Sequence, residues 1–238
     1  REDRVSLVTY AGRSRILLES VPGDQKDIIK DAIDRLGSGG GTGGAEGIET
    51  AYGIAESGYI TNGNNRIVVA SDGDFNVGPS SQMELEDLIV EHRDRGIFLT
   101  ILRVGRGNLN DAMLENMANR GNGTYEYIDH LEQLRKVFIY DYSKFYAVAK
   151  DVKVQVEFNP DNVKSYRLIG YENRILQTED FEDDSKDAGE IGADQNITAL
   201  YEIVPQDNPD YKTVKTFAID FRYKVPGNET SIPMALDI

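Results

Sequence analysis

The 238-residue sequence contains no cysteine, which excludes disulfides, thiolate metal sites and cysteine nucleophiles. It also lacks a basic excess: the formal net charge is −15, so no surplus of Lys and Arg exists to neutralise nucleic-acid phosphates or an anionic membrane surface. No apolar run is long enough to span a bilayer, and the first residues do not form a signal peptide. We therefore expect a globular protein that neither binds nucleic acid nor inserts into a membrane, but that is compatible with cations or basic partners.

The first part of the chain alternates short apolar runs with amphipathic segments. Ile67–Ala70 and Ile97–Leu102 are almost wholly apolar, as in strands that are covered on both sheet faces. The segments between them carry apolar residues at helical spacing; Asp24 is expected to cap the first of these helices, whose stripe includes Ile28 and Ile33. Alternating strands and helices predict a doubly wound, mostly parallel α/β sheet.

The pattern changes after about Ala149. Val152–Phe158 alternates apolar and polar residues, which is typical of a half-buried antiparallel strand. Further strands are expected at four places, and no helical stripe of useful length occurs between them: 166–169, 198–204, 213–223 and 232–236. The sequence thus predicts an α/β domain over residues 1–148 and a smaller, all-β, sandwich-like domain over residues 149–238.

Two polar residues are candidate metal ligands. Asp72 directly follows the apolar strand at Ile67, and ligands of open α/β sheets bind outside the carboxyl ends of the strands. A carboxylate there suits a hard cation, although Asp72 could equally make a local turn. Thr42 lies in a glycine-rich loop before a helix and could reach the same sheet edge. A helix precedes that loop and no acidic residue follows at the required spacing, so a dinucleotide site is rejected.

The segments around these two residues resemble a known family. Gly40–Ile48 and Ile67–Asn76 look like the second and third segments of the metal-ion-dependent adhesion site of von Willebrand factor type A domains. Supporting blocks occur at 3–12, 96–102 and 121–125. Three later blocks, 149–160, 166–174 and 187–192, are similar to a bacterial subgroup in which a β-rich C-terminal domain follows the type A domain.

The resemblance implies a Rossmann-like, non-enzymatic protein-binding module. It assigns Thr42 and Asp72 as ligands of Mg²⁺, with Mn²⁺ and Ca²⁺ as alternatives, and places Ser71, Asn76 and Gly43 beside the ion or the partner. In this family the ion is completed by an Asp or Glu of a protein partner. Family members often carry exported or lipoprotein-type N-termini, which implies a location outside the cytoplasm, in the periplasm or anchored to the cell envelope of a bacterium.

One family segment has no counterpart in this sequence. The first metal segment, Asp-x-Ser-x-Ser on the central strand, lies upstream of the strand matched by Val5–Tyr10. The ion is therefore expected to bind weakly. A gap, a second polypeptide or a rearranged partner is expected between the strand at Val5 and the strand at Ile67.

Other functions are weighed against this interpretation. Asp72 could hold Mg²⁺ for phosphoester chemistry, but no general base, Lys or Arg cluster, or second carboxylate accompanies it. A purely structural assembly domain with an inactive metal site is the other alternative. His92 and His130 are expected to be surface or capping residues, because no serine or acid is patterned with them. The acidic run Glu179–Asp187 is expected to be a solvated loop, because a Ca²⁺ loop would need glycine where Ala188 stands.

Overall fold

The computed structural model describes residues 2–37, 43–72, 79–105, 111–170, 175–212 and 214–238. The chain divides into two compact units, Arg1–Tyr140 and Asp141–Ile238, which we call the N-terminal and C-terminal units. This division lies upstream of the expected boundary at residues 148 and 149, which falls inside a long strand of the C-terminal unit. The change near Ala149 thus marks where apolar and polar residues begin to alternate along that strand, and it does not mark the boundary between the two units.

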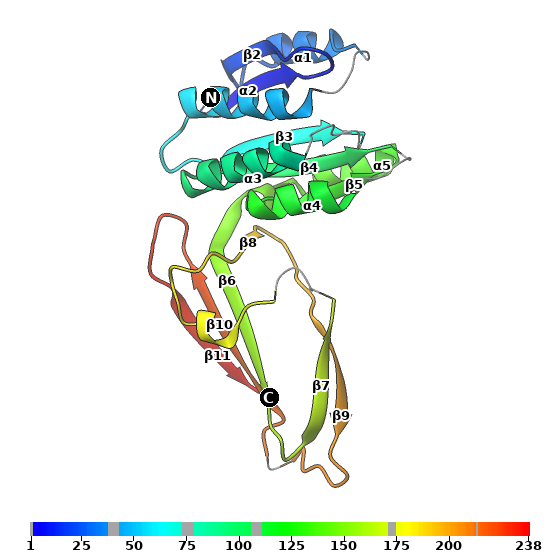
Figure 1. Ribbon diagram of the computed structural model, residues 1–238, viewed down its shortest axis with the longest axis vertical. Helices are drawn as coiled ribbons and strands as arrows, with labels where there is room; N and C mark the ends of the chain where they lie inside the picture. The colour runs from blue at the N-terminus through cyan, green and yellow to red at the C-terminus, as the bar shows by residue number, and fades with distance from the viewer. Residues whose placement is uncertain (1, 38–42, 73–78, 106–110, 171–174, 213) are drawn as a thin grey trace. The chain divides into compact units, whose positions relative to one another are not determined.

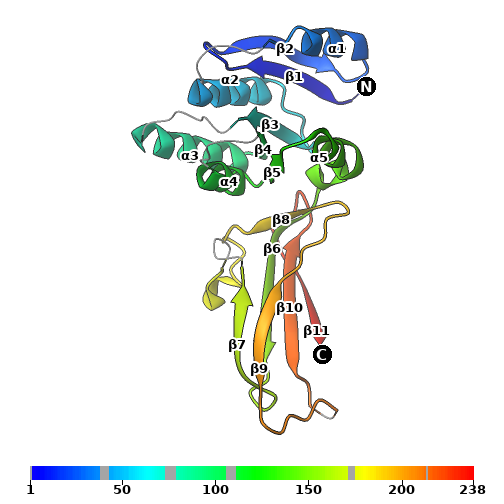
Figure 2. The same ribbon diagram turned by 90° about the vertical axis from the view of Figure 1, so that its right-hand side faces the viewer.

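The N-terminal unit alternates strands and helices along the chain (Figure 1). Its elements are β1 (Arg4–Thr9), β2 (Arg15–Pro22), α1 (Lys26–Asp34), α2 (Gly44–Ser57), β3 (Asn65–Ser71), α3 (Pro79–Asp94), β4 (Ile97–Val104), α4 (Asp111–Arg120), β5 (Tyr125–Ile128), α5 (Leu131–Arg135) and a π-helical turn, η1 (Lys136–Tyr140). Figure 2 shows α2, α3 and α4 along one side of the strands, with α1 and α5 on the other.

The core of this unit surrounds a parallel three-stranded sheet in the order β3–β4–β5. Every residue of β4 except the last is buried, which explains its continuous apolar sequence. The core joins the sheet to the helices through Ile48 and Tyr52 of α2, Ile89 of α3 and Met117 of α4. The predicted doubly wound α/β fold is confirmed.

Strand β1 belongs to a different sheet from β3. It pairs antiparallel with β2, and the described residues contain no ladder of hydrogen bonds between β1 and β3. Helix α2 contacts both strands and spans the two sheets. A side-chain hydrogen bond also joins them, because the hydroxyl of Tyr10 donates to the carbonyl oxygen of Ala70. The two strands therefore do not share one sheet, and the interruption lies between β1 and β3, where the resemblance to the family implied a gap or a rearranged partner.

Helix α1 departs from its predicted capping and burial. It begins at Lys26 with Gln25 as the N-cap residue and no side-chain cap, so the cap predicted at Asp24 is wrong. Ile28 and Ile33 are about half exposed, at 49% and 50%. The physical reason is that α1 packs on β2 of a two-stranded sheet, which is too narrow to cover the whole apolar stripe.

The C-terminal unit is built from antiparallel strands, and its described residues contain no α-helix. Its strands are β6 (Ala147–Phe158), β7 (Val163–Ile169), β8 (Gly189–Gly192), β9 (Leu200–Pro205), β10 (Phe217–Lys224) and β11 (Ile232–Asp237), with 3-10 turns η2 (Tyr142–Phe145) and η4 (Thr178–Asp180). One sheet has the order β11–β10–β6–β8, and β7 and β9 form a separate ribbon.

Aromatic contacts connect the ribbon to the four-stranded sheet. The ring of Phe158 lies 4.4 Å from that of Tyr166 and 5.4 Å from that of Tyr201, between centroids. This second all-β region confirms the remainder of the predicted fold class. Among the helices of the described residues, none has the length and hydropathy needed to cross a membrane.

Candidate metal-binding site

The carboxyl end of β3 presents the candidate ligand Asp72. Ser71, the last residue of the strand, is buried, whereas Asp72 follows it outside the strand and is exposed. The two residues differ in exposure because the parallel pairing of β3 with β4 extends to Ser71 and does not include Asp72. A carboxylate is therefore held at a fixed sheet edge and open to solvent, which is the position predicted for it.

Tyr10 joins this edge to the end of β1. Its hydroxyl donates to the carbonyl oxygen of Ala70, and Ser71 makes a side-chain hydrogen bond with it. Burial raises the pKa of Tyr10; the Ser71 hydrogen bond lowers it in part, and the negative charge of Asp72 raises it further. The phenol therefore stays neutral near neutral pH. Tyr10 has no role in the sequence prediction, yet it lies against both Ser71 and Asp72.

The beginning of α2 is packed against Tyr10 from the other side. The N–H of Gly43 donates to the backbone oxygen of Tyr10 at 3.1 Å. A Cβ atom on Gly43 would lie 2.9 Å from the backbone oxygen of Gly12, and one on Gly47 would lie 2.5 Å from Cβ of Tyr10. Only glycine permits this close approach. Gly43 and Gly47 thus allow the beginning of α2 to pack closely against the residues that follow β1.

The described residues bring Gly43, Ser71 and Asp72 to one region around Tyr10. Thr42 and Asn76, the other residues assigned by resemblance, lie outside the described residues. Thr42 directly precedes Gly43 in the chain. Whether its hydroxyl shares an ion with Asp72 therefore stays a prediction.

The chemistry of these groups fits a hard cation that retains water. Among the described residues, no group of three or more His, Asp or Glu side chains could enclose a metal ion. Asp72 supplies one exposed carboxylate, and Mg²⁺ commonly binds through one or two carboxylates while keeping several waters. The residues present would hold such an ion loosely, and an additional oxygen ligand would be needed for tight binding.

A buried arginine lies on the neighbouring strand at the same sheet edge. Arg103 of β4 is fully buried and pairs in register with Ser71 of β3. Its Nε atom lies 3.6 Å from Oδ1 of Asp111, and its guanidinium lies 5.1 Å from the ring centroid of Tyr127. Because the side chain has no exposed surface, it cannot present its charge to a phosphate. Its sequence signal is a single charge at the end of an otherwise apolar strand.

The two histidines show no catalytic arrangement. His92 is buried, so its prediction as a surface or capping residue is wrong; Nε2 lies 3.3 Å from Oε1 of Glu56 and Nδ1 lies 2.9 Å from the oxygen of Leu88. His92 therefore links α3 to α2 within the core. His130 is the N-cap residue of α5, without a side-chain cap, and its ring contacts the carboxylate of Asp129.

Comparison with known proteins identifies the first unit. Residues 1–138 match the family model described as von Willebrand factor type A domain. The chain belongs to this family. Residues 143–238 match a second model, described as the C-terminal region of the uncharacterized protein YfbK. The predicted type A domain with a distinct C-terminal domain, as in a bacterial relative, is therefore confirmed.

The chain is also similar to a curated protein and shares its fold with a solved structure. The uncharacterized protein YfbK of Escherichia coli K12 is 46% identical over 203 residues, which is 85% of this chain and 35% of the relative. The solved structure of a von Willebrand factor type A protein from Catenulispora acidiphila covers 98% of this chain and 56% of that protein, with a TM-score of 0.56 and 15% identity. The chain thus spans about a third of the length of the curated relative it matches.

Proposed function

We propose that the N-terminal unit is a protein-binding module that recognises an acidic group of its partner through a divalent cation. The observation that carries the proposal is the position of Asp72, an exposed carboxylate directly after the buried end of β3. Membership of the type A family supports it. Mg²⁺ is the ion we expect, with Mn²⁺ and Ca²⁺ as alternatives, because all three bind oxygen ligands.

The charge of the proposed ligand set favours an acidic partner. Asp72 carries one negative charge and Thr42 none, so a bound divalent ion would keep a net positive charge. A bound cation is the largest local charge in such a site, and it would attract an Asp or Glu side chain. Ser71, Gly43 and Asn76 are proposed to line the region around the ion and to position water or the partner.

The two alternatives predict different results. A Mg²⁺-dependent phosphoester-processing enzyme would need an accessible positive group near Asp72, but Arg103 is fully buried. A structural assembly domain with an inactive site would bind its partner without metal. A screen of phosphate esters addresses the first alternative, and a binding assay with and without a chelator addresses the second. Turnover that disappears with Asp72→Asn would replace our proposal by the enzymatic one.

Isothermal titration calorimetry with MnCl₂ and MgCl₂ tests the metal requirement. We expect a weak site in this chain and no measurable site in Asp72→Asn, which keeps the side-chain shape but removes the charge. Asp87→Asn on α3 is the matched control, because Asp87 is exposed and its side chain makes no hydrogen bond or ion pair with the residues that the structure describes. Equal metal binding by wild type and Asp72→Asn would contradict the assigned ligand.

We also propose an extracytoplasmic location, from the resemblance to exported bacterial members of this family. Fractionation of bacterial cells that express the full-length protein tests this proposal. Recovery with the periplasmic or envelope fraction is expected, and recovery with cytoplasmic markers alone would contradict it.

A further inference from the structure

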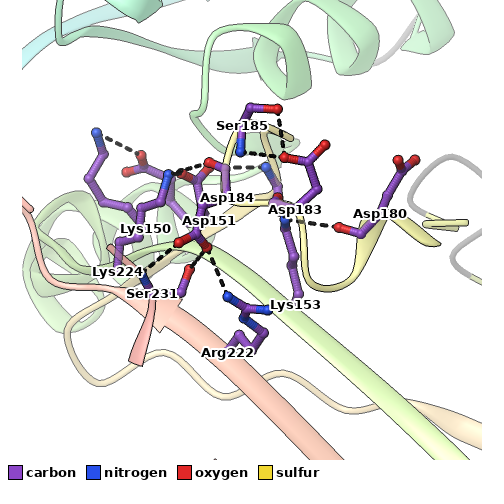
Figure 3. A network of polar contacts seen from close by, with 12 residues as sticks. Lys150, Asp151, Lys153, Asp180, Asp183, Asp184, Ser185, Arg222, Lys224 and Ser231 are labelled. Carbon is purple, nitrogen blue, oxygen red and sulfur yellow. Dashed lines mark hydrogen bonds and ion pairs between the residues drawn. The ribbon is translucent and has the colours of Figure 1, made fainter. Parts of the chain in front are cut away.

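The acidic run of the C-terminal unit is anchored to its sheet, although none of its residues is buried, so the solvated loop predicted from sequence is also held in place (Figure 3). The carboxylate of Asp184 accepts hydrogen bonds from Arg222 at 3.1 Å and from the hydroxyl of Ser231. Lys224 donates to the backbone oxygen of Asp184 at 2.8 Å and pairs with Asp151 at 2.8 Å. The contacts to the run come from β10 and from the residue before β11, and Asp151 of β6 pairs with Lys224 of β10.

A second anchor fixes the beginning of the same run. Lys153 of β6 is buried, and its ammonium donates to the backbone oxygens of Asp180, at 3.1 Å, and Asp183. Lys153, Arg222 and Lys224 are thus all engaged with the loop or with Asp151 (Figure 3). The charged groups of these three side chains are therefore occupied by contacts within the C-terminal unit.

Three carboxylates near the anchors make no such contacts. Glu179 and Glu182 of the run and Asp220 of β10 have no hydrogen bond or ion pair from their side chains in the described part of the chain. All three line a groove of about 690 Å³, together with Phe181, Arg222 and Met234. The guanidinium of Arg222 lies 5.9 Å from the ring centroid of Phe181, so its charge faces the ring and Asp184.

The groove also borders an open sheet edge. Strand β11 ends the sheet order β11–β10–β6–β8, and within the described residues it pairs only with β10. The side chains of β11 are exposed along its whole length. An open edge of this kind can accept an extended backbone, while pockets beside it select alternate side chains.

We infer that this groove binds an extended peptide segment that carries Lys or Arg side chains. The three unpaired carboxylates provide the complementary charge, and the aromatic face of Phe181 can pack against the apolar stem of such a side chain. A second copy of this chain is disfavoured as the occupant because its net charge is −15. This surface belongs to the C-terminal unit and is independent of the metal site proposed above.

Fluorescence anisotropy with a labelled eight-residue peptide of alternating Arg and Val tests the inference on the whole chain. A peptide of alternating Glu and Val is the charge-reversed probe. The groove variant combines Glu179→Gln, Glu182→Gln and Asp220→Asn. The control variant removes the same charge at exposed positions outside the groove, through Asp31→Asn, Asp161→Asn and Asp207→Asn.

We expect the basic peptide to bind and the acidic peptide not to bind. The groove variant should bind the basic peptide about tenfold more weakly, because it loses three exposed ion pairs that each contribute only modestly to binding. The control variant should stay within about twofold of wild type, and added NaCl should weaken binding. Circular dichroism checks that both variants remain folded.

Three results would overturn the inference. Equal losses in the two variants would mean that net charge alone attracts the peptide. Equal binding of the acidic peptide would remove the charge argument. Absence of binding of the basic peptide to the folded wild-type chain at millimolar concentration would show that the groove does not accept this class of ligand. Phe181→Leu gives an independent readout, since it should weaken binding without changing any charge.

Discussion

Replacement of Asp151 by Asn tests how much the buried ion pair between Asp151 and Lys224 stabilises the C-terminal unit. Asp151 has a φ of 48°, a conformation that Asn adopts readily, so the substitution keeps the backbone and the side-chain shape. Its carboxylate pairs with Lys224 at 2.8 Å and accepts the N–H of Ala188 at 3.1 Å. The side chains of Asp151 and Lys224 are only 17% and 7% exposed. The variant would therefore leave a buried ammonium without its counter-charge.

The expected loss follows from that burial. Removing one partner of a buried ion pair costs about 3–5 kcal/mol, because the remaining charge stays desolvated. Lys224 keeps its bond to the backbone oxygen of Asp184, so we expect the lower end of this range, about 3 kcal/mol. The second substitution Lys224→Met in the Asp151→Asn background should recover much of the loss, because it removes the unpaired charge and keeps an apolar side chain.

Hydrogen–deuterium exchange of the whole chain, read by mass spectrometry, measures this effect locally. Peptides that cover β6 and β10 should lose protection in Asp151→Asn, while peptides from the N-terminal unit should not change. Asp161→Asn is the control, because Asp161 is exposed and has no ion pair within the described part of the chain. A decrease of less than about 0.5 kcal/mol in the opening free energy of β6 and β10 would refute the reasoning, because an ordinary surface substitution has an effect of that size.

Three further predictions concern packing and pH. Gly47→Ala should destabilise the N-terminal unit by about 1–3 kcal/mol in urea unfolding, because the added Cβ would meet the side chain of Tyr10. Gly53→Ala in the same helix should instead stabilise this unit by about 0.4–1 kcal/mol, because no atom lies near the added Cβ. Tyr10→Phe should cost about 1 kcal/mol by the same measurement, because the hydrogen bond to the β3 carbonyl is lost. The hydrogen bond from Ser231 lowers the pKa of the Asp184 carboxyl below its ordinary value of 3.8. Its stabilising contribution is therefore present above about pH 3.8 and is lost as pH falls through the folded-state pKa. Hydrogen–deuterium exchange of the acidic loop should show this loss, and protection that increases as pH falls below 3.8 would contradict it.

The regular elements could be predicted because burial leaves a periodic pattern. β4 is covered on both faces, so its sequence is nearly continuously apolar. The alternation along β6 predicted a strand, but it does not indicate which face is covered, because Val154 is exposed and Lys153 is buried. β8 escaped prediction from pattern, since Gly189–Gly192 offers only one large apolar residue. The strand β3, which Asp72 directly follows, was predicted because a short apolar run is a local signal.

Contacts between distant residues could not be predicted in this way. Tyr10 contacts Ala70 across 60 positions, and Asp184 meets Arg222 across 38. The acidic run was expected to be a solvated loop because it does not fit a Ca²⁺-binding loop, and composition alone does not reveal which basic residues a sheet will bring to it. Arg103 was likewise overlooked, although one charged residue within an otherwise nearly apolar, buried strand indicates a buried ionic contact.

Water-proton relaxation with Mn²⁺ tests the central claim most directly, because it reports both the ion and the waters that a carboxylate would displace. We predict enhanced relaxation when Mn²⁺ binds the whole chain, competition by Mg²⁺, and a decrease when N-acetylglutamate is added. Asp72→Asn should abolish all three effects, whereas Asp87→Asn should preserve them. Enhancement in Asp72→Asn equal to that of wild type, or a bound ion whose relaxation ignores added carboxylate, would contradict metal-centred recognition of an acidic group.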